Sequence, residues 1–440
     1  LVRVAEAALG EPRSGLWMKL AGTAGMAVVS QNSIYAKENT KSKLRRRIEM
    51  FSEYNNHARR LGKVALTVLG TMAIGLSTAF AIGADRWIRV EKTISLNPGT
   101  PVFDPVLQPL LDQVLTRAIE RERADGGFII AADPHTGLVL GVANRINDVD
   151  LQSNPHWALS YRMEPASAMK TIAVASALEL GLTQVSEAHG CENGKYRLGA
   201  HTYHDYKPFS FLTTAETVIF SSNICGIKIG ERLGAQAIHQ MVADFGFGPG
   251  GSAADFPAAR VGEVARPEQM SPDEYVALIS TGMSGFSGFR VTPLEMVAAY
   301  GAIANGGNLM KPHSAQIAER QVVRRVLSDD TSVKMREILA RVVREGTGDH
   351  AASRQFATAG KTSTAYSPKD PPHKLLGGEQ AIAGFIGFAP VNHPRIVVYV
   401  GIIKPRPLKG QVVGRIHAGP VFRESVDAVL QALGVLPDKI

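Results

Sequence analysis

The pattern of hydrophobic and polar positions predicts a helix and then a β-hairpin after residue 105. Residues 106–123 repeat Leu, Val and Ile at helical spacing. Two strand-like apolar runs follow, GGFIIAADPHTG and LVLGVAN, and residues 133–137 between them are of turn-forming types.

The rest of the pattern predicts an α+β fold. Apolar positions recur at helical spacing through most of the middle of the chain, for example over 168–181, 213–233 and 293–305. Strand-like runs return in FATAGKTSTA, AIAGFIGFAPV and RIVVYVGIIKP, and a helical pattern over 419–434 follows. Strands at both ends with a mainly helical middle predict an antiparallel sheet flanked by helices.

A separate apolar stretch, residues 64–84, has no charged side chain and predicts one transmembrane helix. Its length spans the ~30 Å hydrocarbon core at 1.5 Å per residue. The arginines that precede it place the N-terminus in the cytoplasm and the rest outside. We therefore expect a basic cytoplasmic tail over 1–63, an anchor over 64–84 and a linker over 85–105. A cleaved signal peptide and a buried soluble helix are the alternatives.

The net charge of +8 comes almost entirely from the N-terminal tail. Residues 1–63 hold 12 Lys and Arg against 5 Asp and Glu, so the remaining chain is nearly neutral. A nucleic-acid-binding domain carries its own basic face, and this distribution argues against one.

The chain has two cysteines, Cys191 and Cys225. Two cysteines cannot complete a four-thiolate metal site, and no C-x-x-C motif occurs. We favour two separate buried thiols, because the sequence gives no sign that they meet. A single disulfide, which requires an oxidising compartment, is the alternative.

The first candidate for chemistry is Ser167-Ala-Met-Lys170, at the start of a predicted helix after Pro165. A serine and a lysine three residues apart lie on one helix face. This spacing suits a serine nucleophile with a lysine base, provided that burial or nearby positive charge lowers the pKa of the lysine. Alone, the motif more often marks a capping serine and a surface lysine.

The second candidate is Ser221-Ser222-Asn223, between an apolar segment and a predicted helix. A hydroxyl and an amide at this spacing can relay a proton and hold a peptide carbonyl. The same pattern is common at helix caps, so it is a weak signal by itself.

The third candidate is Lys361-Thr362-Ser363-Thr364, on a predicted strand after Gly360. The small residues indicate a strand that another segment approaches closely. Such a strand can bind an extended peptide by strand addition, with Lys361 supplying positive charge for a carboxylate.

Order makes these motifs more specific together than apart. Ser221 follows Ser167 by 54 residues, and Lys361 follows Ser221 by 140. The three elements in this order are the signature of penicillin-binding proteins and active-site-serine β-lactamases.

From about residue 106 onward the chain resembles the class B penicillin-binding proteins, the monofunctional transpeptidases of cell elongation and division. A transpeptidase domain over 106–440 is thus expected. The resemblance extends to stretches outside the three motifs: CENGKYRLG (191–199), GFRVTPLEMVAAYGAIANGG (288–307), VVREGTGDHAA (342–352), IGFAPVNHPRIVVYVGI (386–402) and GPVFRESVDAVLQALGVLPD (419–438).

The resemblance implies an acyl-enzyme mechanism on peptidoglycan stem peptides. Ser167 would attack the penultimate D-Ala carbonyl, Lys170 would take its proton, and Ser221, bridging the two lysines, would pass a proton to the departing D-Ala. An amine of a neighbouring stem peptide would then resolve the ester. β-Lactam antibiotics would acylate Ser167, and neither a metal nor an organic cofactor is implied.

The same resemblance implies how substrate is held. Asn223 would bind the substrate amide, and Lys361 would set the local electrostatics. Thr362 and Thr364 would bind the carboxylate of the leaving D-Ala or of a β-lactam. The backbone N–H groups of Ser167 and Thr364 would form the oxyanion hole, typically the largest electrostatic contribution to acyl transfer.

Three features depart from the family pattern. Ala166 precedes the nucleophile where the family usually has Gly, and Ser363 replaces the Gly of Lys-Thr-Gly, where it is expected to crowd a β-lactam or substrate. The third is the short segment between anchor and domain, which leaves no room for the usual pedestal. Binding of a membrane glycosyltransferase partner through a pedestal is accordingly in question.

Other functions are compatible with parts of the pattern. A serine β-lactamase or penicillin sensor shares the motifs, and a non-catalytic scaffold of the cell-wall machinery is an alternative of another class. His201, His204 and Asp205 suggest a metal site, but their spacing favours a polar loop near the rim of the active site.

Overall fold

The protein is described by a computed structural model, in which the described residues begin at Phe103. The tail (1–63), the anchor (64–84) and nearly all of the linker (85–105) lie outside the described residues. No helix within the described part is long and apolar enough to cross a membrane. The described residues are 103–147, 154–249, 256, 259–282, 288–314, 320–367, 380–406 and 412–439.

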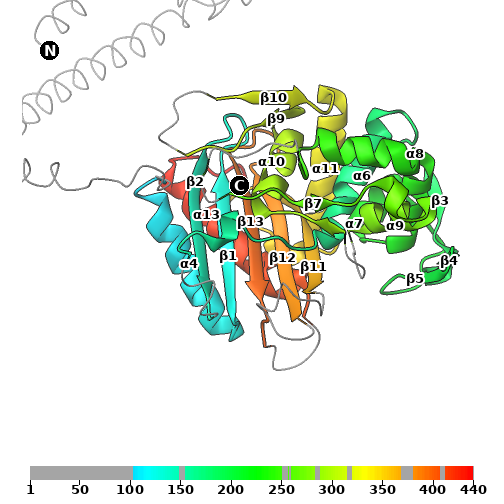
Figure 1. Cartoon of the computed structure of the whole chain (residues 1–440). Helices are drawn as coiled ribbons and strands as arrows, with labels where there is room; N and C mark the ends of the chain where they lie inside the picture. The colour runs from blue at the N-terminus through cyan, green and yellow to red at the C-terminus, as the bar shows by residue number, and fades with distance from the viewer. Residues whose placement is uncertain are drawn as a thin grey trace, which may run out of the picture. The chain divides into compact units, whose positions relative to one another are not determined.

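A five-stranded antiparallel sheet forms the centre of the domain (Figure 1). The first hairpin and the last strands of the chain meet in it, as the pattern predicts, because β1 pairs with β13. The order across the sheet is β11-β12-β13-β1-β2. The strands are β1 (Gly126–Ala132), β2 (Val139–Ile146), β11 (Ala359–Ser367), β12 (Gln380–Ala389) and β13 (Ile396–Ile403).

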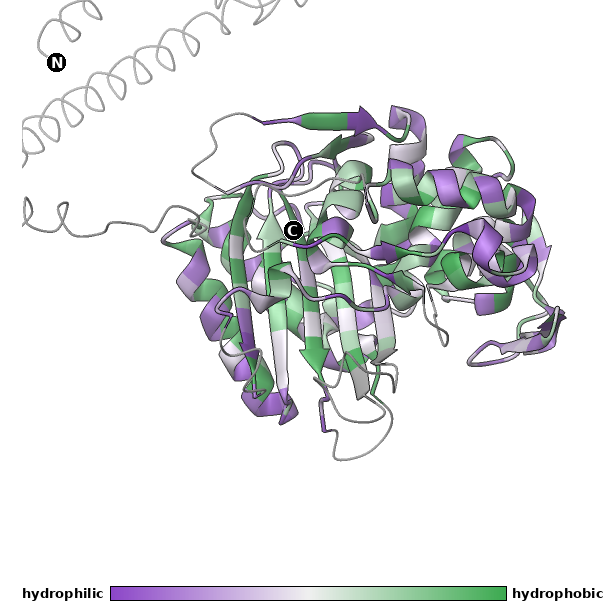
Figure 2. Ribbon diagram, in the orientation of Figure 1, coloured by the Kyte–Doolittle hydropathy of each residue, from purple (hydrophilic) through white to green (hydrophobic). Residues whose placement is uncertain are grey.

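Helices α4 (Leu107–Glu122) and α13 (Gly419–Ala432) cover one face of the sheet. Their apolar residues and those of the strands form one buried cluster, while their outer faces are polar (Figure 2). This one-sided burial follows from the amphipathic pattern that predicts both helices. The short helix α12 (Gly414–His417) leads into α13.

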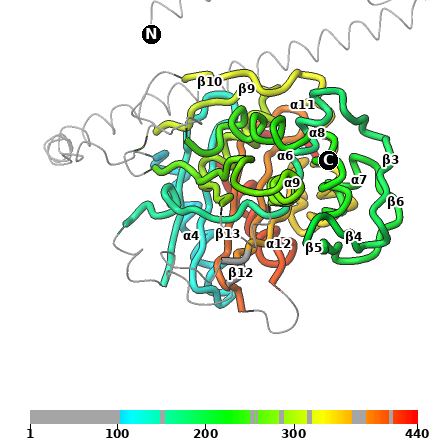
Figure 3. Tube along the Cα trace, turned by 45° about the vertical axis from the view of Figure 1, so that its right-hand side comes forward, coloured from blue at the N-terminus to red at the C-terminus, as the bar shows by residue number. Residues whose placement is uncertain are grey.

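The mainly helical middle covers the other face and extends beside β11 (Figure 3). Every residue of α10 is buried, and so are all of α6 except its last residue, which fits helices that are apolar on all sides. The helices of this region are α6 (Met169–Glu179), α7 (Thr214–Ile219), α8 (Asn223–Asp244), α9 (Pro272–Thr281), α10 (Pro293–Ala304) and α11 (Asp329–Glu345).

Short two-stranded sheets lie among the helices of this middle region. The residues His201 to His204 lie on a strand of the β4–β5 hairpin, and not in the polar loop expected from the sequence. The pairs are β3 (Ala188–Gly190) with β6 (Phe211–Thr213), β4 (Lys195–Leu198) with β5 (His201–His204), β7 (Glu263–Val264) with β8 (Phe289–Arg290), and β9 (Asn308–Met310) with β10 (Val322–Arg325).

The predicted helix over 213–233 is wrong in one respect, because the structure divides it into α7 and α8. Thr213 begins α7 with a capping box, and α7 ends at Ile219. Ser222 then caps a new helix by accepting a hydrogen bond from the backbone N–H of Cys225. The continuous apolar run hides this break, which turns Ser221 out of the helix.

The favoured interpretation of the cysteines is also wrong. Cys191 and Cys225 form a disulfide and are both fully buried. The bond joins the first turn of α8 to the segment that precedes the β4–β5 hairpin. Residues 34 positions apart meet because the hairpin folds back against α8, which no local pattern predicts.

Candidate active site

Ser167 lies in a 3₁₀ turn, Ala166–Ala168, that leads directly into α6. Lys170 follows on the same face and donates a hydrogen bond of 2.7 Å from Nζ to Ser167 Oγ. Lys170 is completely buried, and this burial lowers its pKa to about 7, with the carboxylate of Asp205 acting in the opposite direction. A lysine with this pKa is partly neutral near pH 7 and can accept a proton.

The backbone conformation of Ala166, the residue before Ser167, explains why the family that the sequence resembles usually has glycine at this position. Its φ of 48° lies in the left-handed region, which glycine adopts without a steric cost. Its backbone N–H donates to Gly282 O at 2.9 Å, which fixes the turn against the end of α9. The methyl group of Ala166 is buried and leaves the geometry of the turn intact.

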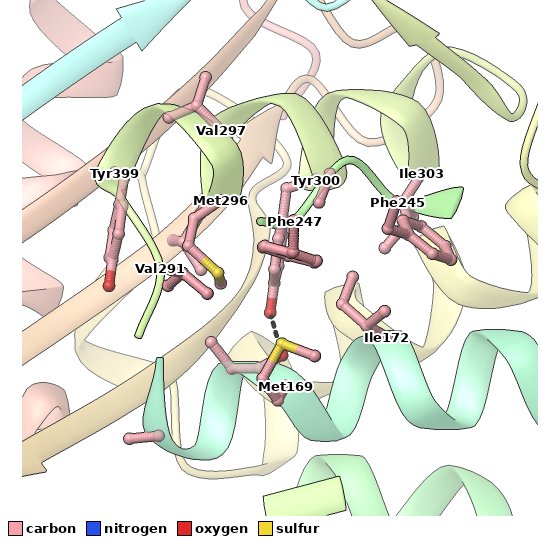
Figure 4. Close-up of a cluster of buried hydrophobic side chains, with 14 of the residues drawn as sticks. Met169, Ile172, Phe245, Phe247, Val291, Met296, Val297, Tyr300, Ile303 and Tyr399 are labelled. Atoms are coloured by element: carbon pink, nitrogen blue, oxygen red, sulfur yellow. Dashed lines mark hydrogen bonds between the residues drawn. The ribbon is translucent and has the colours of Figure 1, made fainter. Parts of the chain in front are cut away.

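Tyr300 of α10 supports the same turn from behind (Figure 4). Its hydroxyl donates to the carbonyl oxygen of Ala168 at 3.0 Å and lies 2.9 Å from Thr171 Oγ1. Ala168 lies between Ser167 and Lys170 on the chain, and Thr171 follows Lys170 directly. Tyr300 is fully buried beside Met169, so the start of α6 is held by packing and by hydrogen bonds.

Ser221 lies opposite, in the break between α7 and α8, with a left-handed φ of 60°. Lys361 donates from Nζ to Ser221 Oγ at 2.9 Å. The same Nζ lies 3.3 Å from both the carbonyl oxygen and Oγ1 of Thr362. Burial and the nearby Lys170 hold the pKa of Lys361 well below its usual value. Two buried lysines therefore hold one serine hydroxyl each, and no hydrogen bond joins Ser221 to Lys170 in this structure.

Asn223 begins α8, and Asp205 fixes this helix start in place. The Asn223 side chain donates from Nδ2 to the carbonyl oxygen of His204 at 2.7 Å. Asp205 accepts hydrogen bonds from Ser222 Oγ at 2.7 Å and from the backbone N–H groups of Asn223 and Ile224 at 2.5 and 3.2 Å. A carboxylate is favourable at a helix N-terminus, and this one anchors the Ser-Ser-Asn element.

Strand β11 places Thr362 and Thr364 on one face and Lys361 and Ser363 on the other, as strand alternation requires. The Thr362 hydroxyl lies 3.2 Å from Thr347 Oγ1, and Thr364 Oγ1 accepts from the backbone N–H of Gly414, the first residue of α12, at 3.2 Å. The close approach predicted at Gly360 is real, because a Cβ there would lie 2.5 Å from Ile386 O of β12.

Ser363 is accommodated by the sheet. Its side chain is 1% exposed and points toward Gly384, its partner on β12, and not into open space. A Cβ added at Gly384 would lie 2.1 Å from Ser363 Oγ and 3.5 Å from the ring of Tyr399. The Ser363 hydroxyl therefore fills space that the missing side chain of Gly384 leaves on the neighbouring strand. The crowding of a β-lactam or substrate by Ser363 stays a prediction.

We predict that Gly384→Ala lowers the free energy of unfolding by about 1–3 kcal/mol, the usual cost of overpacking. In the Ser363→Gly background the same change should be neutral or stabilising, because the clashing hydroxyl is gone and a strand glycine is replaced. Chemical denaturation of the two single variants and the double variant measures this coupling. Equal effects of Gly384→Ala in both backgrounds would contradict it.

A cleft of about 790 Å³ joins these elements. Its walls include Ser167, the break between α7 and α8, and strand β11, and its far rim carries charged residues. Within the described residues, no group of three or more His, Cys, Asp or Glu side chains is placed to hold a metal ion. The residues that line the cleft are Ser167, Tyr206, Lys207, Phe220, Ser221, Asn223, Arg344, Glu345, Gly346, Thr347, Asp349, Thr362, Ser363, Thr364, Val413, Gly414, Arg415 and Ile416.

The sequence does not predict the roles of several residues around the cleft. Asp205 and Tyr300 act on the two serine elements from distant parts of the chain, Thr347 follows α11, and Arg415 lies on α12. The sequence points to Asp205 only as part of a candidate metal site, and nothing in its spacing predicts that it fixes a helix start. The others carry no motif.

The fold and the site define a class of protein. An antiparallel sheet with a Ser-x-x-Lys helix start facing a Ser-x-Asn element and a Lys-Thr strand is the arrangement of penicillin-interacting serine domains. The chain belongs to the penicillin binding protein transpeptidase domain family, whose sequence model matches residues 127–427.

Individual relatives agree with this family. Stage V sporulation protein D of Bacillus subtilis is 30% identical over 371 residues, which cover 76% of this chain and 54% of that protein. The probable peptidoglycan D,D-transpeptidase PenA of Neisseria meningitidis serogroup A is 28% identical and is covered over 57% of its length, against 77% of this chain. The chain thus spans little more than half of these relatives.

A solved structure matches the domain itself. The transpeptidase domain of Burkholderia pseudomallei penicillin-binding protein 3 superimposes with a TM-score of 0.67 at 29% identity. The match covers 77% of this chain and 98% of that one. The α+β fold with an antiparallel sheet, predicted from the sequence, is confirmed.

Proposed function

We propose that this chain is a peptidoglycan D,D-transpeptidase that works through an acyl-enzyme on Ser167. The observation that carries the proposal is the 2.7 Å hydrogen bond between Lys170 Nζ and Ser167 Oγ, in which a buried lysine with a pKa of about 7 faces a serine at the cleft wall. Further support comes from relatives whose names describe them as peptidoglycan D,D-transpeptidases.

In the first half-reaction, Ser167 Oγ bonds to the carbonyl carbon of the penultimate D-Ala as neutral Lys170 takes the hydroxyl proton. The negative oxygen that forms would be held by the backbone N–H groups of Ser167 and Thr364. Ser221, whose hydroxyl is held by Lys361, gives a proton to the nitrogen of the terminal D-Ala as the C–N bond breaks, and the proton that Lys170 took from Ser167 replaces it on Ser221. Terminal D-Ala then leaves as a free amino acid.

In the second half-reaction, the amine of another stem peptide attacks the Ser167 ester. Its nitrogen bonds to the carbonyl carbon, the ester C–O bond breaks, and Ser167 regains its proton. The product is a cross-linked peptide, and no redox step or cofactor enters the balance. Asn223 would hold the donor peptide through its side-chain amide, which is exposed at the helix start.

We further propose that residues 64–84 anchor the chain in the cytoplasmic membrane by a single span, with the catalytic domain on the outer side. The Cys191–Cys225 disulfide supports an outer location, since disulfides persist in oxidising compartments. A membrane glycosyltransferase that supplies uncross-linked glycan is the partner we expect. Protease protection of vesicles of known orientation tests the topology.

The activity is tested with the wild-type protein, a D-Ala-D-Ala-terminated stem peptide and an acceptor amine. We expect release of D-Ala together with a cross-linked product, and a fluorescent penicillin adduct that persists for minutes to hours. Rapid turnover of the penicillin would identify a β-lactamase instead. A long-lived adduct without any peptide product would favour a penicillin sensor, and no adduct would favour a scaffold.

A further inference from the structure

The terminal carboxylate of a D-Ala-D-Ala peptide that binds in the cleft needs a cation, and Lys361 has no N–H left to donate to it. A lysine amine has three N–H donors when it is protonated and two when it is neutral. Ser221 Oγ, Thr362 O and Thr362 Oγ1 lie within 2.9–3.3 Å of Lys361 Nζ and can take all three. The Lys361 side chain is also 0% exposed. A carboxylate that leaves water needs paired charge, which must then come from another side chain of the cleft.

Arg415, on α12 at the rim of the same cleft, meets this need. Its guanidinium pairs with Asp349 through two hydrogen bonds, one from Nε at 2.5 Å and one from Nη2. These use two of its five N–H donors, and the hydrogen bonds of the described residues assign no partner to the others. The Arg415 side chain is 49% exposed, so an oriented, permanently charged group faces the open cleft.

Both members of this ion pair are joined to the hydroxyls proposed to bind the carboxylate. Gly414, the residue before Arg415, donates its backbone N–H to Thr364 Oγ1 at 3.2 Å. On the other side, Thr347, two residues before Asp349, lies 3.2 Å from Thr362 Oγ1. Because Thr364 accepts this bond with its oxygen, its own O–H remains able to donate to a ligand.

Glycine at position 414 allows this approach. A Cβ there would lie 2.3 Å from Gly384 O and 2.6 Å from Ser363 O. The segment that carries Arg415 is thus in backbone contact with β11 and β12, and the guanidinium is tied to the strand that binds the substrate.

The other cations of the cleft are engaged elsewhere. Arg344 pairs with Glu337 on α11. Lys207 lies over the ring of Phe209 at 5.0 Å and is also near Tyr206. Within the described residues, neither side chain forms a hydrogen bond to the segments that hold the Thr362 and Thr364 hydroxyls.

We propose that Arg415, oriented by Asp349, binds the terminal carboxylate of the D-Ala-D-Ala peptide and the corresponding carboxylate of β-lactams. This inference rests on the proposed function and assigns its substrate-anion site. Lys361 then serves mainly to hold Ser221, while Thr362, Thr364 and Arg415 hold the carboxylate.

The test compares benzylpenicillin, which carries the carboxylate, with its methyl ester, which does not. The second-order rate constant of acylation is measured for both compounds. We expect Arg415→Ala and the polar, uncharged Arg415→Gln to slow acylation by benzylpenicillin about tenfold, the usual size of a lost charge-assisted hydrogen bond. Acylation by the ester should stay near the wild-type rate, which also shows that each variant is folded.

The matched control is Arg406→Ala, because Arg406 forms an ion pair with Asp125 and is exposed, but lies outside the cleft lining. It should leave the acid-to-ester ratio unchanged. The proposal is overturned if both Arg415 variants keep the wild-type ratio. Failure of the proposed function looks different, because it is seen in the wild-type protein, as no adduct, as rapid turnover of the penicillin, or as an adduct without a cross-linked peptide product.

Discussion

Replacing Ser167 with alanine is expected to abolish the covalent penicillin adduct. Ser167 Oγ is the hydroxyl that the buried Lys170 amine contacts at the cleft wall. Loss of a serine nucleophile in other acyl-transfer enzymes lowers the rate by about 10⁶-fold, which leaves no adduct on the time scale of hours. Intact-protein mass spectrometry after penicillin treatment should show one intact penicillin on the wild type and none on Ser167→Ala.

A matched control is available on the same helix. Ser176 is buried in α6 and donates to the backbone carbonyl of Ile172, away from the motif. Ser176→Ala should therefore keep the adduct. An adduct on Ser167→Ala, or its loss from both variants, would contradict the assignment of the nucleophile.

Replacing Lys170 with methionine is expected to lower the acylation rate by about 10²–10⁴-fold, the range for a lost general base. In the wild type the rate should rise with pH and level off above about 7, because the Lys170 ammonium must lose its proton first. The variant should lack this rise. Stopped-flow acylation at pH 5 to 9 measures both profiles.

The same substitution should stabilise the protein, which separates lost chemistry from lost folding. The pKa of Lys170 is about 7 when folded and near 10.5 when unfolded, so the unfolded chain binds more protons between these values. Wild-type stability then rises with pH from 7 to 10.5, and the penalty is largest below 7. Lys170→Met should melt above the wild type at pH 6, and this advantage should shrink toward pH 10. A lower melting temperature at pH 6 would contradict the burial of a charged lysine.

The sequence pattern predicts the sheet and the helices around it well, because each has a clear period. The hairpin over 126–146 and the helix over 107–122 are examples in which apolar spacing and turn residues agree. The break between α7 and α8 escapes the pattern, since apolar residues run through it and a single serine cap decides the geometry. Similarly, the Cys191–Cys225 bond depends on a hairpin that folds back from elsewhere.

The three motifs also predict which residues the structure brings together. Ser167 with Lys170, and Ser221 with Lys361, form the contacts that the motifs anticipate. The sequence does not show which of the charged side chains around the cleft are buried and which are exposed. A lysine on an edge strand suggests a cation facing solvent, yet Lys361 is enclosed, and the exposed charge at the rim belongs to Arg415 of α12, outside the three motifs.

The pairing of β1 with β13 also constrains how the chain is made. One edge of β1 has its partner only when Ile396–Ile403 has been synthesised, more than 260 residues later. At the usual 5–20 residues per second, the ribosome needs on the order of tens of seconds to cover that distance. During this interval the apolar β1–β2 hairpin has one unpaired edge. Biosynthesis of the domain therefore depends on a holding chaperone or on a late, concerted collapse.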